Sequence, residues 1–139
     1  IIEGLKRKNM NNVPVLAVET EGADSLSVSL EAGRHVEIDD IKSIATSLGA
    51  KKVSRAAYDL CRRHEVVSHV VSDKQAVDAC LKFSNDHRIL VEPACGASLA
   101  ALYSPADFLK DKKCILAIVC GGAGVTISQL EMWKRKLDK

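Results

Sequence analysis

Short runs of apolar residues alternate along the chain with segments whose apolar positions recur at helical spacing. The runs are too short for ordinary helices and are bounded by polar or glycine-rich residues, so they predict strands buried on both faces. Strands are expected on this ground at residues 13–18, 66–71 and 115–119, and residues 89–91 form a shorter run of the same kind.

Helical periodicity and capping residues predict the segments between these runs. The clearest amphipathic helix in the first half is expected over 41–48, which Asp39 or Asp40 would cap and Gly49 would close. Further helices are expected at 26–32, at 54–63, after a Ser72–Gln75 capping box, and at 98–103. Strands alternating with helices indicate an α/β layer architecture with a largely parallel sheet.

Composition and charge narrow the class of protein. At 139 residues, 47% of them hydrophobic, the chain is sized for one domain with a core of its own. A net charge of +2 gives no reason to expect a nucleic-acid partner, and no apolar stretch approaches membrane-spanning length. Five cysteines without a CxxC pair suggest reduced thiols in an intracellular protein, with Cys95 and Cys114 expected in the core. The start at Ile1, without a signal peptide or an initiator Met, suggests a piece of something longer.

The stretch from Cys114 to Leu130 carries the candidate chemistry. A predicted buried strand leads into the turn Cys120-Gly121-Gly122-Ala123-Gly124, and a helix opens at Thr126 or Ser128. Ligands bind at the carboxyl ends of strands in open α/β sheets, and helix N-termini favour anionic groups. The turn alone is also typical of an ordinary α/β loop, and a lone cysteine there is more often a small buried hydrophobe.

Four loops raise the specificity of this interpretation: ETEGADS at 19–25, SLGAKKV at 47–53, VEPACGA at 91–97 and IVCGGAG at 118–124. Together, and in this order, they resemble the L-serine dehydratase (serine/threonine dehydratase) family of pyridoxal-phosphate enzymes. The resemblance implies the α/β, parallel-sheet, three-layer fold type II, which is similar to the tryptophan synthase β subunit. It covers nearly the whole chain and implies the carboxyl-terminal half of such an enzyme, so that residues 1–139 would be part of the large cofactor-binding domain.

The resemblance also implies site residues. Cys120 would face the pyridine nitrogen of pyridoxal 5'-phosphate with Gly121 beside it, and Ser47 would lie against one face of the cofactor ring. A monovalent cation such as potassium would be bound by oxygen atoms, as hard cations prefer. These would come from the Glu19 carboxylate, Ser25 and the carbonyls of Ala23, Leu48 and Ala50. On the residues alone, Glu19 is better explained as a capping or loop carboxylate. Glu92-Pro93 matches the family's Glu-Pro motif, and it either orders the cofactor pocket or caps the helix after Pro93.

The activity implied is α,β-elimination by an L-serine and L-threonine ammonia-lyase of amino-acid catabolism and gluconeogenesis, giving pyruvate or 2-oxobutyrate and ammonia. The Schiff-base lysine, the small domain and the phosphate loop of the family would all precede Ile1, so no catalytic residue is expected in this chain and the upstream half would be its partner. A cytoplasmic, or alternatively mitochondrial, homodimer is implied. Two alternatives stay open: a serine racemase or threonine synthase of the same fold, and a non-catalytic α/β binding module.

Overall fold

The fold is built around two parallel strands that are connected through helices. The computed structural model describes all 139 residues. Strands β1 (Val15–Thr20) and β2 (Val66–Val71) pair in parallel, with Val15 opposite Val66 and Thr20 opposite Val71. Their carboxyl ends therefore lie at the same edge of the sheet.

The remaining elements follow the alternation that the sequence predicts. In chain order they are α1 (Ile2–Arg7), α2 (Ser25–Glu31), the 3-10 turn η1 (Thr46–Leu48), α3 (Arg55–Cys61), α4 (Asp73–His87), α5 (Pro93–Tyr103), the 3-10 turn η2 (Asp107–Leu109) and α6 (Ile127–Leu137). No helix is both long enough and apolar enough to cross a lipid bilayer.

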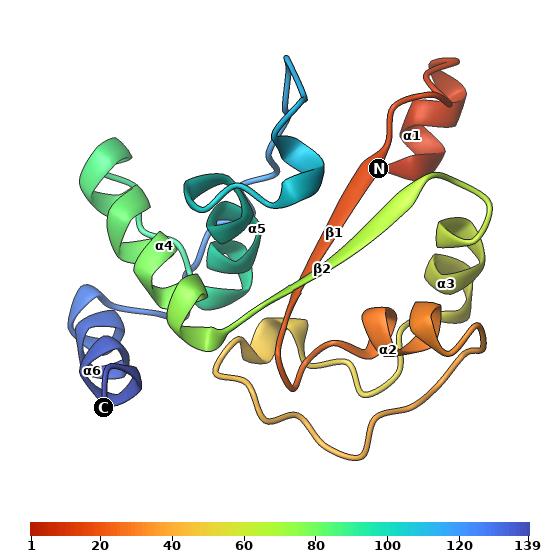
Figure 1. Cartoon of the computed structure of the whole chain (residues 1–139). Coiled ribbons are helices and arrows are strands. Elements are labelled where there is room, and N and C mark those ends of the chain that lie inside the picture. Colours follow the sequence, from red (N-terminus) through yellow and green to blue (C-terminus); the bar gives the residue numbers. More distant parts are fainter.

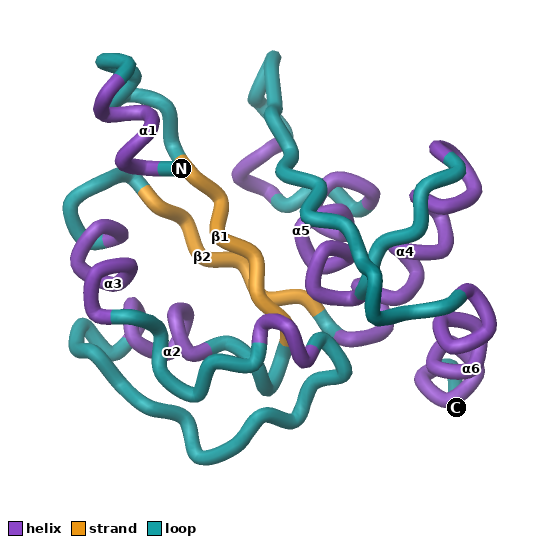
Figure 2. The backbone as a smooth tube through the Cα atoms, turned by 180° about the vertical axis from the view of Figure 1, so that it is seen from behind, coloured by secondary structure: helices purple, strands orange, loops and turns teal.

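Helices cover the strand pair on two sides. Helices α2 and α3 lie on one side and α4 and α5 on the other, with α6 beyond α4 (Figure 1), and the view from behind shows the same layers (Figure 2). Helix α5 contacts both strands and packs most extensively against α4. The main core lies in this second layer, and its buried members are Val71, Val77, Ala79, Cys80, Phe83, Val91, Cys95, Ala97, Leu99, Ala100, Val125 and Leu130.

Several predicted elements are confirmed by their caps. The Ser72 hydroxyl accepts the Gln75 N–H at 3.2 Å and the Gln75 side chain accepts the Ser72 N–H at 2.8 Å, so the capping box of α4 is complete. Thr126, rather than Ser128, caps α6, because its hydroxyl accepts the Gln129 N–H. The predicted helix at 98–103 begins earlier, at Pro93, whose missing N–H and fixed φ suit the first turn.

The predicted helix over 41–48 is wrong. Only the 3-10 turn η1 forms at its end, and Gly49 has a φ of −72° rather than a left-handed value. The Lys42 N–H instead donates to the Gly22 carbonyl, and the Ile44 N–H donates to the Asp73 carboxylate. Because these amides are bonded to other segments, the intrahelical ladder is lost, although Ile44 and Leu48 still pack against the core.

The predicted buried strand at 115–119 is also wrong. The segment has no regular secondary structure, Leu116 is 87% exposed, and Cys114, expected in the core, is exposed too. A strand needs a hydrogen-bonded neighbour, and the two strands of the sheet pair only with each other. The run at 89–91 likewise forms no strand, although Val91 is fully buried.

Candidate functional site

The glycine turn after Cys120 is fastened to the start of α5. Gly121 has a φ of +103°, and its carbonyl accepts the Glu92 N–H at 3.1 Å. A Cβ on Gly122 would lie 2.6 Å from the Val91 carbonyl carbon, so only glycine lets the two backbones approach this closely. The turn is therefore held by backbone contacts at the amino end of α5.

Cys120 is exposed at this turn. Its only hydrogen-bond partner is the carbonyl of Ile118 in its own segment, at 3.9 Å, which is a weak thiol contact. The single S–H donor is thus held only by a weak contact and could turn to another acceptor, so it fits the role of partner to a pyridine nitrogen. Glu92 is half-buried next to the same turn, because a Cβ on Gly124 would lie 3.6 Å from its Oε2.

Ser47 lies on a second segment that contacts α5. It is the middle residue of η1 and is exposed, and η1 packs against α5. Helix α5 therefore contacts both segments that the sequence assigns to the cofactor, with the Cys120 turn at its amino end. Cys120, Gly121 and Ser47 remain candidate cofactor contacts.

The loop after β1 carries three of the five candidate cation ligands. The Glu19 carboxylate accepts the Leu26 N–H at 3.0 Å through Oε1 and the Ser27 N–H at 2.8 Å through Oε2, which makes it a cap for α2. Burial raises the pKa of Glu19, while these two hydrogen bonds act in the opposite direction. Ala23 is fully buried, and Ser25 is buried with its carbonyl accepting the Ser29 hydroxyl at 2.7 Å.

The other two candidate ligands flank Gly49. The Leu48 carbonyl accepts the Ala50 N–H at 2.8 Å, which folds the chain back on itself directly after η1. No three acidic, histidine or cysteine side chains come together in a cluster that could hold a metal ion. A cation here would consequently depend mainly on carbonyl and hydroxyl oxygens, with Glu19 the one carboxylate in the candidate set.

A buried polar contact between distant segments was missed by sequence reasoning. The hydroxyls of Thr20 and Ser43 lie 2.8 Å apart, and the Ser43 hydroxyl donates to Asp73 Oδ1 at 2.5 Å. These residues come from the end of β1, an irregular segment and the first turn of α4. Their separation along the chain leaves no periodic or motif signal that could have found them.

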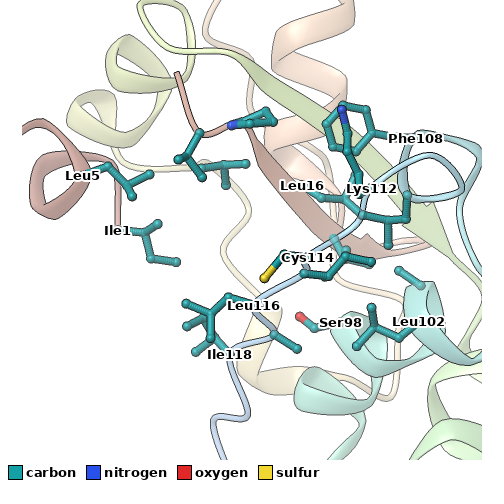
Figure 3. A pocket seen from close by; sticks show the side chains of 18 residues that line it. Ile1, Leu5, Leu16, Ser98, Leu102, Phe108, Lys112, Cys114, Leu116 and Ile118 are labelled. Carbon is teal, nitrogen blue, oxygen red and sulfur yellow. The ribbon is translucent and has the colours of Figure 1, made fainter. Parts of the chain in front are cut away.

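An apolar groove lies between β1 and the segment at 114–118. Fifteen of its eighteen lining residues are hydrophobic, and its volume is about 300 Å³. Figure 3 shows Leu16 from β1, Leu102 from α5, and Cys114, Leu116 and Ile118 from the irregular segment around it. The groove is separate from the candidate cofactor contacts, because neither Cys120 nor Ser47 lines it.

Comparison with known proteins shows the family. The sequence profile of the pyridoxal-phosphate dependent enzymes matches residues 1–121, and the chain therefore belongs to this family. It is 39% identical over 145 residues to human L-serine dehydratase/L-threonine deaminase, which covers 99% of this chain and 44% of that protein. It is 40% identical to the L-serine dehydratase of Dictyostelium discoideum, over all of this chain and 41% of that protein.

Solved structures agree with the sequence relatives. The crystal structure of a fungal L-serine ammonia-lyase from Rhizomucor miehei has a TM-score of 0.87 and 34% identity, covering 97% of this chain and 44% of that one. Maize serine racemase has a TM-score of 0.77 and 26% identity, covering 96% of this chain and 42% of that one. The fold type II expectation and the resemblance to the L-serine dehydratases are confirmed. The chain spans less than half the length of these relatives.

Proposed function

We propose that this chain is the carboxyl-terminal part of the large cofactor-binding domain of a pyridoxal-phosphate-dependent L-serine and L-threonine ammonia-lyase. The observation that carries the proposal is the Cys120 turn, which presents an exposed thiol at the amino end of α5 in a chain whose curated relatives are L-serine dehydratases. When bound, the cofactor supplies an electron sink for loss of the substrate's Cα proton.

The residues of this chain would orient the cofactor rather than move the proton. The Cys120 thiol would donate a hydrogen bond to the pyridine nitrogen and leave it unprotonated, since a thiol is neutral and a weak acid. The Gly121 carbonyl, bonded to the Glu92 N–H, fixes where that thiol lies. Ser47 would lie against one face of the cofactor ring and exclude water from that face.

The apolar groove is the feature that favours binding of a partner to this chain. Strand β1 pairs only with β2, and the exposed side chains of Ile115, Leu116 and Ile118 line the groove on the side opposite it. Each large apolar side chain that is removed from water there would stabilise the assembly by roughly 1.5–3 kcal/mol. We infer that the upstream half, which would carry the Schiff-base lysine, the small domain and the phosphate loop, fills this groove with strands of its own.

The same proposal extends to a bound cation and to the location, assembly and metabolic role of the complete enzyme. A potassium ion would be held by Glu19, Ser25 and the carbonyls of Ala23, Leu48 and Ala50, and it would brace the cofactor loops. The complete enzyme would be a cytoplasmic homodimer of amino-acid catabolism. The position of these residues supports a cation site, because Glu19 lies near the carboxyl end of β1 and Ala23 and Ser25 follow in the segment that leaves the strand there.

The test is the Cys120→Ala variant of the full-length enzyme. Because the pyridine nitrogen would lose its side-chain partner in a desolvated site, we expect kcat with L-serine to fall by about tenfold or more, while pyridoxal phosphate still binds. Wild-type kcat in the variant would remove Cys120 from the site. A serine racemase would instead convert L-serine mainly to D-serine, so measuring pyruvate and D-serine together separates the two reactions.

A further inference from the structure

Two buried polar side chains, Thr20 and Ser43, and the half-buried Asp73 form a hydrogen-bonded chain across three segments of the fold. Thr20 is the last residue of β1 and is fully buried, and Asp73 is the first residue of α4, directly after the cap that follows β2. Between them lies Ser43, which is 7% exposed. Its hydroxyl lies 2.8 Å from that of Thr20 and donates to Asp73 Oδ1 at 2.5 Å.

The same groups also hold the backbone that follows Ser43. Asp73 Oδ2 accepts the Ile44 N–H at 3.0 Å, and the Ser43 oxygen accepts the Ala45 N–H at 2.9 Å. Hydrogen bonds to a carboxylate are about twice as strong as neutral ones, and a low dielectric strengthens them further. Asp73 thus uses both oxygens to fix the path of a segment that has no helical hydrogen bonds of its own.

The fixed segment leads directly into the candidate cofactor and cation residues. Ala45 immediately precedes η1, which contains Ser47 and Leu48, and Ala50 follows two residues later. At the other end, Thr20 directly follows Glu19, and its carbonyl accepts the Ala23 N–H at 2.8 Å. The hydrogen-bonded chain therefore joins the two loops from which the cation ligands would come.

We propose that Thr20, Ser43 and Asp73 are positioning residues that hold the Ser47–Ala50 turn in register with the Glu19–Ser25 loop. This inference rests on the proposed function for what the two loops bind. Neither Ser43 nor Asp73 need touch the cofactor, the cation or the substrate. Their effect is to keep the two sets of oxygen ligands at a fixed separation, so that a cation meets a site already assembled.

The test compares Ser43→Ala with Ser72→Ala in the full-length holoenzyme. Ser72→Ala removes the capping box at the start of the same helix, but leaves the Thr20–Ser43–Asp73 contacts intact. Two readouts apply: amide hydrogen exchange over residues 44–50, and the potassium concentration that half-saturates the fluorescence change of bound pyridoxal phosphate.

We expect Ser43→Ala to speed amide exchange over 44–50 by about tenfold, since the Ser43 hydroxyl's bond to the Asp73 carboxylate and the bond that it accepts from the Ala45 N–H are both lost. The half-saturating potassium concentration should rise severalfold. Ser72→Ala should change neither readout. Unchanged exchange in Ser43→Ala would overturn the proposal, whatever the enzyme's reaction. Faster exchange with an unchanged potassium requirement would also overturn it, by showing that the contacts serve folding only.

Thr20→Val keeps the test decisive if Ser43→Ala does not fold. It removes only the hydroxyl at one end of the chain of contacts and preserves the shape of a fully buried side chain. Faster amide exchange over 44–50 together with a higher half-saturating potassium concentration in Thr20→Val supports the proposal. If either quantity stays at its wild-type value, the result contradicts it. A holoenzyme that lacks ammonia-lyase activity but shows the exchange result would instead count against the proposed function.

Discussion

Gly122→Ala should release the Cys120 turn from α5. The new Cβ would meet the Glu92 backbone nitrogen most closely, and it would lie 2.6 Å from the Val91 carbonyl carbon and 2.9 Å from its Cα, where ordinary contact begins near 3.4 Å. These are backbone atoms that cannot rotate away, so the turn must retreat by at least 0.8 Å, the difference between 3.4 and 2.6 Å. Overpacking of this kind costs about 1–3 kcal/mol, and loss of the Glu92–Gly121 hydrogen bond would add about 1 kcal/mol.

Gly124→Ala is the matched control for this substitution. It adds the same methyl group two residues away in the same turn, where the Cβ would meet only Glu92 Oε2, at an ordinary 3.6 Å. In urea unfolding of the full-length enzyme, Gly122→Ala should lower the midpoint by about 1 M or more, and cofactor affinity should fall with it. Equal midpoints for the two variants would refute the close backbone approach.

Two further predictions concern single side chains. Burial raises the pKa of Cys80 to about 12 from an ordinary 9.0, so the thiol should resist alkylation at pH 8 until the chain unfolds. The unfolded thiol loses its proton at lower pH than the folded one. Raising the pH from about 9 to about 12 should therefore lower the free energy of unfolding, and it should do so less in Cys80→Ala. An equal pH dependence of that free energy in both proteins would contradict the burial of the thiol. Glu19→Gln in the full-length enzyme should require more potassium for activity, and an activity titration identical to that of the wild type would exclude Glu19 from a cation site.

The elements that the sequence predicted well are those whose signals are local. The Ser72–Gln75 capping box and the β-branched runs act within a few residues, so β1, β2, α3 and α4 lie close to their expected positions. Helix α6 begins after Thr126, one of its two expected caps, although Leu130 is its one buried residue and Ile127 is 42% exposed.

The predictions that were wrong depend on contacts between distant segments. Residues 41–48 have a helical apolar pattern, but Asp73, far along the chain, binds the Ile44 amide and a different backbone path results. The run at 115–119 has the composition of a buried strand, but pairing decides whether it becomes one. The Cys120 turn could be located from the sequence, whereas its attachment to Glu92 could not, because a backbone contact carries no side-chain signal.

We infer that this chain supplies the cofactor's surroundings, while the upstream half of the enzyme supplies the lysine that joins the cofactor. The most direct test adds pyridoxal phosphate to the 139-residue chain and to the full-length enzyme, reduces each with borohydride, and measures pyruvate formed from L-serine before reduction. We expect one lysine outside this chain to be labelled in the full-length enzyme, which forms pyruvate. In the chain alone, no single lysine should be labelled stoichiometrically, and no pyruvate should form. Clean labelling of one lysine in the chain alone, with turnover of serine, would contradict this inference by showing that residues 1–139 carry the lysine themselves.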